Sequence, residues 1–256
     1  MIVQLKNIIK NIWKKGRMSL VETDWLEENL HKVKIIDCSW HMPQTKRDGF
    51  VEYKEVHIPN SIFFDLDKNS KKETQLPHML VDKMEWEKIV SKMGIRKKDV
   101  LVIYDNSDVV SSCRCWFNFI YFGHDPKLTF VLNGGLKKWI KEKRKVSNKI
   151  TNINFSKYES FEKKELVKDK KKINQNIDIP RFKVIDARSK ERFDGKVPEP
   201  REGLRSGNIK NSKCIPFTLC INEDRTFKNK EELKSVFKKC LDNLDEKNIV
   251  FTCGSG

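Results

Sequence analysis

Residues 85–105 read EWEKIVSKMGIRKKDVLVIYD, a pattern that predicts an amphipathic helix, a break and a short apolar strand. The strand ends at Asp105. Residues 231–253 read EELKSVFKKCLDNLDEKNIVFTC and predict the same three parts in the same order, with Cys253 where the first segment has Asp105. This recurrence indicates that the chain contains one structural unit twice.

Other matched residues place the two copies at one separation. Asp37 in VKIIDCS matches Asp186 in FKVIDAR, 149 residues later, and Ile58 matches Ile209, 151 residues later. Asp105 and Cys253, at the ends of the two corresponding strands, are 148 residues apart. Each copy alternates apolar strands with amphipathic helices, which predicts a mostly parallel sheet flanked by helices. We therefore predict an α/β fold with two tandem domains.

Changes in composition along the chain predict the limits of these domains. We expect a basic N-terminal extension at residues 1–18 and a first domain at residues 19–145. A polar linker rich in lysine should follow at residues 146–180, and a second domain at residues 181–256. Within the linker, KDKKKINQN (168–176) is expected to be the least structured part.

The repeat also predicts that the second domain is incomplete. After its strand, the first copy continues with SDVVSSCRCWFNFIYFGH, KLTFVL and NGGLKKWI, which predict a helix, a strand, and a turn with a helix. Only three residues follow Cys253, so about forty residues expected from the repeat are missing. We expect the chain to be a fragment that is weakly active and poorly stable, and a longer gene product to be active.

Composition excludes several classes of protein. Apolar residues make up 38% of the chain, with six Trp and fifteen Phe, which is enough for real cores and argues against disorder. There is no run of about 20 apolar residues that could span a membrane. The formal charge is +16, but basic residues are not interleaved with aromatic ones. We therefore expect a lysine-rich surface in contact with solvent, and no nucleic acid partner.

The seven cysteines indicate a reducing compartment. Their odd number and wide spacing do not form a disulfide framework, which favours a mitochondrial or cytoplasmic location. Cys113 and Cys115 form a C-x-C, but no second pair lies at zinc-finger spacing, so we expect neither a metal nor a cofactor. Cys240 falls in an apolar series at helical spacing and is expected to be a small core residue.

Residues 1–17 carry five basic and no acidic side chains, with apolar residues at helical spacing. This pattern is typical of an organelle-targeting helix or a segment that lies on a membrane surface. Met18 could instead be the true start of the protein, which would make residues 1–17 a peripheral extension.

The sequence around Cys253 predicts a reactive thiol. A parallel strand that ends in Cys-Gly-Ser-Gly presents its thiol at the carboxyl edge of the sheet, where open α/β folds bind ligands. Gly254 and Gly256 allow backbone N–H groups to turn toward one anion, which favours the thiolate form. The alternative is an inert cysteine at a strand end. Because the first copy has Asp105 at this position, we favour one catalytic and one supporting domain.

The chain resembles the tandem-domain rhodanese-like sulfurtransferases, and most closely those that act on 3-mercaptopyruvate. The resemblance covers about residues 19–256. It rests on seven segments: IIDCSWHMP (35–43), HIPNSIFFDLD (57–67), LPHML (76–80), FGHD (122–125), LNGGLKKW (132–139), VIDARSKERFDGKVPEPREGLRSGNI (184–209) and CGSG (253–256). The thiosulfate-type relatives carry positive residues in the active loop, and Gly254, Ser255 and Gly256 therefore favour the mercaptopyruvate type.

The resemblance implies a sulfur-transfer reaction. It makes Cys253 the nucleophile that takes sulfur from 3-mercaptopyruvate or thiosulfate as a persulfide, with release of pyruvate from the former. Cyanide or a thiol such as thioredoxin then accepts the sulfur. The resemblance also makes Ser255, His78 and Asp67 a proton relay that crosses between the domains. From the sequence alone, His78 is a loop histidine and Asp67 a solvated or capping acid.

Two arginines are candidates for binding the substrate. Arg192 and Arg201 lie nine residues apart in a loop that contains proline and glycine, and two guanidinium groups suit a carboxylate beside a keto oxygen. The resemblance assigns them this role, and gives Gly254 and Gly256 the role of backbone N–H donors. Without it, two surface arginines in a basic protein would be the simpler interpretation.

Other functions remain open at this point. A cysteine phosphatase or arsenate reductase has a similar loop, with an arginine six residues after the cysteine, and that position lies beyond Gly256. A non-catalytic rhodanese-like binding module would not form a persulfide. A basic RNA-binding protein with a rhodanese core would lose its affinity steeply with salt.

Overall fold

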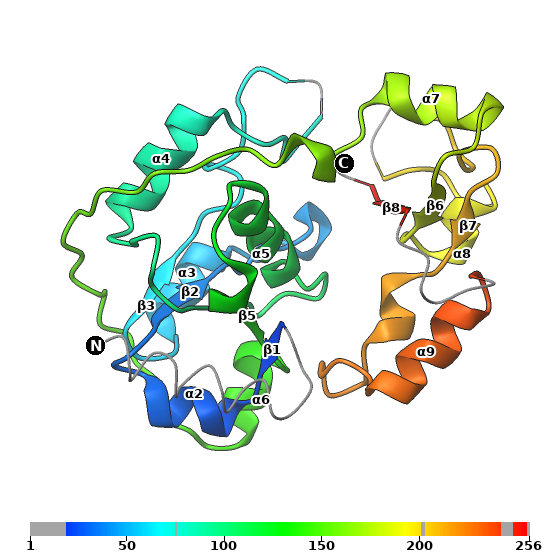
Figure 1. Cartoon of the computed structure of the whole chain (residues 1–256). Coiled ribbons are helices and arrows are strands. Elements are labelled where there is room, and N and C mark those ends of the chain that lie inside the picture. The colour runs from blue at the N-terminus through cyan, green and yellow to red at the C-terminus, as the bar shows by residue number, and fades with distance from the viewer. Residues whose placement is uncertain (1–18, 75, 201–202, 242–247, 255–256) are drawn as a thin grey trace. The chain divides into compact units, whose positions relative to one another are not determined.

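The computed structural model of the protein describes residues 19–74, 76–200, 203–241 and 248–254 (Figure 1). The chain divides into two compact units, Met1–Lys164 (unit 1) and Glu165–Gly256 (unit 2). Each unit contains one parallel sheet with helices around it, which confirms the predicted α/β fold. The domain limits inferred from the sequence remain predictions.

The sheet of unit 1 has five parallel strands in the order β1-β5-β4-β2-β3. The strands are β1 (Leu20–Val21), β2 (Lys34–Asp37), β3 (Ser61–Phe63), β4 (Leu101–Tyr104) and β5 (Thr129–Leu132). Its helices are α2 (Thr23–Asn29), α3 (Gly49–Glu55), α4 (Lys83–Lys92), α5 (Ser112–Tyr121) and α6 (Gly135–Lys141), with 3-10 turns at Pro43–Thr45 and Pro126–Leu128. All residues of β4 and β5 are buried, as expected for central parallel strands covered on both faces.

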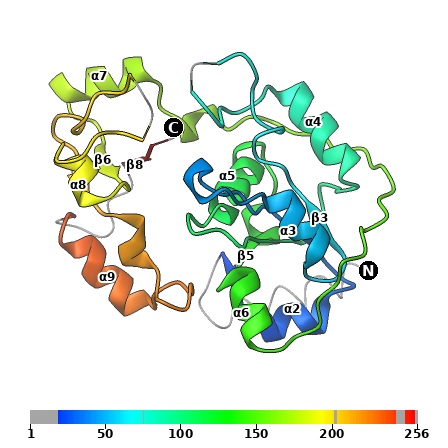
Figure 2. The same cartoon turned by 180° about the vertical axis from the view of Figure 1, so that it is seen from behind.

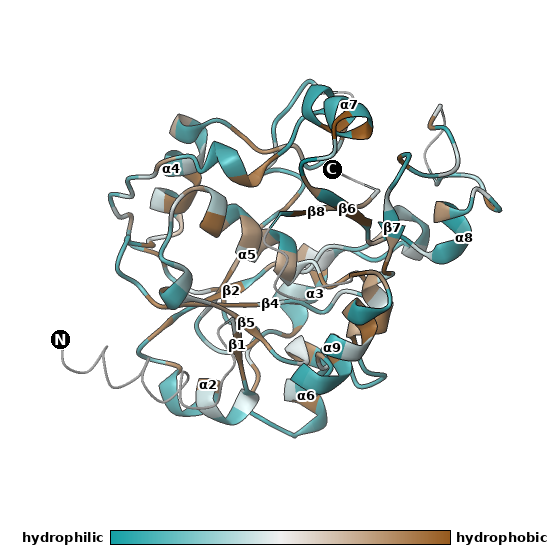
Figure 3. Cartoon of the chain, turned by 45° about the vertical axis from the view of Figure 1, so that its right-hand side comes forward, coloured by the Kyte–Doolittle hydropathy of each residue, from teal (hydrophilic) through white to brown (hydrophobic). Residues whose placement is uncertain are grey.

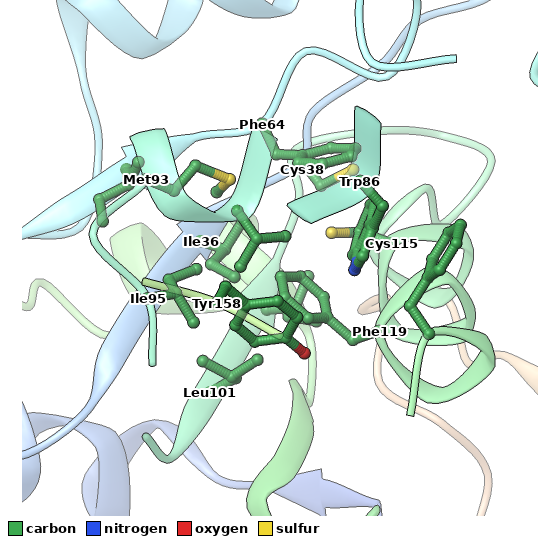
Figure 4. Packing of buried hydrophobic residues seen from close by; sticks show 14 of the residues in the cluster. Ile36, Cys38, Phe64, Trp86, Met93, Ile95, Leu101, Cys115, Phe119 and Tyr158 are labelled. Carbon is green, nitrogen blue, oxygen red and sulfur yellow. The ribbon is translucent and has the colours of Figure 1, made fainter. Parts of the chain in front are cut away.

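Alternate residues of β4 face two separate cores. Leu101 and Ile103 pack in a cluster with Trp86 of α4 and Phe119 of α5, shown in Figure 4. The other residues of β4 pack in a second cluster, to which α2 and α6 contribute. Figures 1 and 2 show α2 and α6 side by side in unit 1. Successive side chains of a strand point to opposite faces of the sheet. The alternation along β4 therefore determines which residues pack against α4 and α5 and which pack against α2 and α6.

Residues 146–164 run along unit 1 and bond to it. Ser147 and His57 exchange two backbone hydrogen bonds of 2.8 Å, and the hydroxyl of Thr151 donates to the carbonyl oxygen of Ser61 at 2.7 Å. Tyr158 is buried in the cluster around Trp86. Tyr158 thus ties this segment to the hydrophobic core of unit 1, although most of its polar, lysine-rich sequence is not buried.

The sheet of unit 2 has three parallel strands in the order β7-β6-β8. The strands are β6 (Lys183–Asp186), β7 (Lys213–Cys214) and β8 (Ile249–Thr252), and the helices are α7 (Lys170–Asp178), α8 (Lys190–Phe193) and α9 (Lys230–Lys238), with 3-10 turns at Lys164–Leu166 and Phe217–Cys220. Figure 3 shows the apolar residues concentrated on the strands. Ile185, Ile215 and Leu241 form a small core, and Cys240 packs against it as expected.

The prediction that residues 168–176 are the least structured part of the linker is wrong, because most of them form helix α7. Asp169 caps this helix by accepting a hydrogen bond of 2.8 Å from the backbone N–H of Lys172. Ile173 and Ile177 line a cavity of about 120 Å³ with apolar residues of β6 and its neighbours. Lysine has a good helix propensity, so a run of charge bounded by a cap and an apolar stripe favours a helix.

The helices of the described part are short. The longest, α4 and α5, have ten residues each, which corresponds to about 15 Å of helix. Among the described residues there is no helix whose length and apolar character would allow it to cross a bilayer.

We expect His124 to make unit 1 sensitive to acid. His124 is fully buried, with its ring nitrogens 3.1 Å from the hydroxyl of Tyr158 and 3.0 Å from the carbonyl oxygen of Asp99, and burial lowers its pKa to about 4. The unfolded chain therefore binds a proton at a higher pH than the folded one. Stability from this group is full above pH ~6.5 and falls by about 3 kcal/mol as the pH drops from there to about 4.

His124→Gln should flatten this pH dependence in urea unfolding followed by Trp fluorescence between pH ~7 and ~4. Asp37, whose pKa burial raises to about 7, acts with the opposite sign, but it is the same in both proteins and cancels in the difference. Equal slopes for the two proteins would contradict the assignment.

Candidate functional site

Strand pairing places Cys253 at the carboxyl edge of the unit 2 sheet. Strand β8 runs parallel to β6 with Asp186 opposite Thr252, and the N–H of Ala187 donates to the carbonyl oxygen of Thr252 at 2.8 Å. Cys253 is the next residue of the chain and its side chain is exposed. The thiol therefore lies where open parallel sheets bind their ligands.

Gly254 brings the backbone close to an arginine. A methyl group on its Cα would lie 2.7 Å from Nη2 of Arg192, which is too close for any side chain unless the arginine moves. Arg192 belongs to helix α8, whose first turn is capped by the hydroxyl of Ser189. The absence of a side chain at Gly254 thus lets a guanidinium group approach the residue after the thiol.

Glu199 holds Arg192 in place. Its carboxylate accepts hydrogen bonds from Nε and Nη2 of Arg192 at 3.2 and 2.5 Å, and from Nη1 of Arg188 at 2.7 Å. The bonds from Arg192, and then those from Arg188, hold the pKa of Glu199 below its ordinary value. Within the described part of the chain, Nη1 of Arg192 makes no hydrogen bond, so one nitrogen of this guanidinium remains available to a ligand.

Arg188 links this pair to the end of β6. Its Nε and Nη2 donate to the buried carboxylate of Asp186 at 2.6–3.0 Å. In unit 1 the matching carboxylate, Asp37, has no arginine partner among the described residues and accepts hydrogen bonds from the N–H and hydroxyl of Ser39, at 2.9 and 2.6 Å, and from Tyr104. Burial therefore raises the pKa of Asp37 to about 7. The two copies thus compensate the same buried acid in different ways.

Unit 1 has a carboxylate where unit 2 has its thiol. Asp105 follows β4 as Cys253 follows β8, and it is nearly buried. Its two oxygens accept hydrogen bonds of 2.8 Å from the backbone N–H groups of Ser107 and Ser112, and Ser112 is the first residue of α5. The loop after this strand therefore binds an anion, which in unit 1 is part of the chain itself.

Two other predicted residues meet in unit 1. Nε2 of His78 lies 2.8 Å from Oδ1 of Asp67. His78 is almost fully buried, while the side chain of Asp67 is 67% exposed. A histidine paired with a carboxylate has a defined orientation and can exchange a proton through its other nitrogen. The structure therefore brings together the two acid-base residues suggested by the resemblance.

The remaining predicted site residues, Arg201, Ser255 and Gly256, lie outside the described residues. Sequence reasoning missed Glu199, which orients Arg192, and Trp40, whose indole N–H donates to Asp67 at 3.0 Å. The one available signal for Glu199 was its position between two prolines in the loop that carries Arg192 and Arg201. For Trp40 the signal was its place three residues after the buried Asp37.

Residues 22–142 match the rhodanese-like domain family. The chain is 39% identical to the mitochondrial thiosulfate/3-mercaptopyruvate sulfurtransferase 1 of Arabidopsis thaliana, over 93% of this chain and 68% of that protein. The chain belongs to the rhodanese-like tandem sulfurtransferases. It is also 34% identical to the 3-mercaptopyruvate sulfurtransferase of Mus musculus, over 93% of this chain and 82% of that protein.

Among solved structures, SseA from Escherichia coli, described as a 3-mercaptopyruvate sulfotransferase with the rhodanese fold, matches with a TM-score of 0.83. The two are 27% identical, and the match covers 93% of this chain and 88% of SseA. The fold and the family expected from the sequence of this sulfurtransferase are thus confirmed, and sulfur donors and acceptors are the class of substrate that the family implies.

We expect Arg188→Met to destabilise unit 2 by about 3 kcal/mol, because it leaves the buried Asp186 without its counter-charge. All six tryptophans precede residue 165, so Trp fluorescence reports only on unit 1. Hydrogen exchange of the β6 amides should therefore accelerate while the fluorescence transition stays in place. The double variant Asp186→Asn, Arg188→Met should recover part of the loss, and a purely additive loss would contradict the pairing.

Proposed function

We propose that this chain moves the outer sulfur of 3-mercaptopyruvate, or of thiosulfate, through a persulfide on Cys253 to cyanide or a thiol acceptor. One observation carries the proposal. An exposed thiol follows β8 where, in unit 1, a carboxylate is bound by two backbone N–H groups. A loop of this kind favours an anion, and a thiolate is the anionic form that attacks sulfur.

In the proposed reaction, the thiolate of Cys253 attacks the sulfur of 3-mercaptopyruvate and forms a sulfur–sulfur bond. The carbon–sulfur bond breaks, its electron pair goes to the carbon, and the resulting enolate takes up a proton to give pyruvate. An acceptor thiolate then attacks the outer sulfur and releases the thiolate of Cys253. Both steps balance without a cofactor.

Other residues would bind the substrate and supply the proton. Arg192 and Arg201 would hold the carboxylate and keto oxygen, with backbone N–H groups of Gly254 and Gly256 around the sulfur. We propose that Ser255, His78 and Asp67 pass on the proton. The distance of 2.8 Å between His78 and Asp67 supports the last two of these roles.

The chemistry suggests the acceptor, and the name of a relative suggests the location. We propose a small thiol or a thioredoxin-like protein as the acceptor, because it can present a thiolate to a persulfide. The Arabidopsis relative is named mitochondrial, and we propose a mitochondrial or cytoplasmic location for this chain. Membership of the sulfurtransferase family favours this function over the cysteine phosphatase that the loop alone allows.

The first test is the persulfide. Treatment with 3-mercaptopyruvate should add one sulfur atom to the peptide that contains Cys253, detected by mass spectrometry after alkylation, with release of pyruvate. Cys253→Ser should abolish both signals. Cys113→Ser is the matched control, because Cys113 is the other exposed cysteine, and it should retain them. A persulfide on Cys113, or pyruvate release by Cys253→Ser, would refute the proposal.

A second test addresses Arg192. Gly254→Ala should displace the flexible end of this arginine with little change in stability, and raise KM for 3-mercaptopyruvate by about tenfold. In an Arg192→Met background, Gly254→Ala should have almost no further effect on KM, because both changes act on the same contact. Additive effects on KM would show that Gly254 acts without Arg192.

A further inference from the structure

The carboxylate of Asp67 is held on two sides although its side chain is largely exposed. Oδ1 lies 2.8 Å from Nε2 of His78, and Oδ2 accepts a hydrogen bond of 3.0 Å from Nε1 of Trp40. The ammonium group of Lys72 donates its hydrogen bond to the backbone carbonyl oxygen of Asp67 and not to the carboxylate. An exposed carboxylate with a single partner would rotate and return to water, because water competes well for such groups.

Trp40 is a rigid donor. Its backbone N–H points at the hydroxyls of Ser107 and Ser111, at 3.0 and 3.2 Å. These hydroxyls are 2.6 Å apart, and that of Ser111 also donates to the carbonyl oxygen of Cys38 at 2.5 Å. The indole ring packs against the apolar cluster around Trp86. Its N–H therefore has a fixed direction before any substrate binds.

The same indole ring contacts the histidine. The ring centroids of Trp40 and His78 are 4.8 Å apart, and the ring planes meet at 87°. The backbone of His78 has a φ of +57°, which is uncommon for a residue other than glycine, and Arg114 donates to its carbonyl oxygen. The imidazole is therefore positioned by its backbone, by the edge-to-face contact with Trp40 and by its bond to Asp67.

We propose that Trp40 is a positioning residue that selects the tautomer of His78. With Oδ2 of Asp67 bound to the indole N–H, Oδ1 accepts from Nε2–H of the imidazole. Nδ1 then carries the lone pair, and in the described residues no hydrogen bond is made to it. The nitrogen that exchanges a proton in the reaction is thus Nδ1. The catalytic part of this inference rests on the proposed function, whereas the tautomer does not.

Tautomers are distinguished directly by ¹⁵N chemical shifts. In uniformly ¹⁵N-labelled protein at about pH 8, where a histidine ring is neutral, His78 should show a protonated Nε2 and an unprotonated Nδ1. The chain has five histidines, and His78→Gln assigns the signal. Trp40→Phe should replace this pattern by averaged shifts from both tautomers, because Asp67 loses the bond that fixes it.

Trp116→Phe is the matched control. Trp116 is also a half-buried tryptophan of unit 1 that packs on the same cluster, and its indole N–H donates to the carbonyl oxygen of Thr129 at 3.1 Å. This variant loses one indole hydrogen bond without touching Asp67, so the His78 shifts should stay as in the unmodified chain. Trp40→3-benzothienylalanine keeps the fused rings and replaces only the N–H, and it should behave as Trp40→Phe even if the phenylalanine variant is unstable.

Kinetics then connect the tautomer to turnover. Trp40→Phe should lower kcat with 3-mercaptopyruvate about fivefold and leave KM unchanged, because it affects the proton transfer and not the binding of the carboxylate. Trp116→Phe should change neither. His78 shifts that are the same in Trp40→Phe as in the unmodified chain would refute the inference, and so would an Nδ1-protonated ring in the unmodified chain. If the shifts change as expected but no persulfide forms on Cys253, the proposed function fails and the tautomer selection stands.

Discussion

Arg188 reaches back from the first turn after β6 to the buried carboxylate of Asp186, and its remaining nitrogen bonds to Glu199. Glu199 in turn orients Arg192 beside Gly254. Each charge in this chain of contacts is compensated by a neighbour, because Asp186 pairs with Arg188, and Glu199 pairs with both Arg188 and Arg192. The position of the guanidinium next to the candidate nucleophile therefore depends on a buried acid at the end of a different strand.

The two copies of the unit show how one scaffold diverges. In unit 1, β2 pairs in parallel with β4, the strand before Asp105. In unit 2, β6 pairs in the same way with β8, the strand before Cys253. In unit 1, Ser39 compensates the buried acid and the carboxylate of Asp105 occupies the loop itself. An occupied loop has no capacity for an external anion. The copy with an exposed thiol in the corresponding place is the one that could take sulfur from a donor.

The repeat in the sequence predicted two copies of one parallel α/β unit, because apolar strands and amphipathic helices recur in the same order at nearly constant separation. The separations of Asp37 from Asp186 and of Asp105 from Cys253 correspond to matched positions in the two sheets. Composition alone gave a wrong prediction for α7, because this lysine-rich run forms a capped helix with an apolar stripe. The roles of Glu199 and Trp40 could not be predicted, since each acts on a side chain that the fold, and not the sequence, brings near it. His78 and Asp67 were found through resemblance, and their pairing is visible only in the fold.

The segment after β2 in unit 1 and the segment after β6 in unit 2 have similar structural roles. The first supplies Trp40, which holds Asp67 against His78, and the second supplies Arg188, which holds Glu199 against Arg192. In each case the supporting residue is itself fixed, by serine hydroxyls in unit 1 and by Asp186 in unit 2. The supported groups are a histidine and an arginine, whose polar atoms must keep a defined direction for the proton transfer and the carboxylate binding proposed above. Both supporting residues follow a strand that is hydrogen-bonded to a neighbour on each side of its sheet, so each support is anchored in regular structure and not in a free loop.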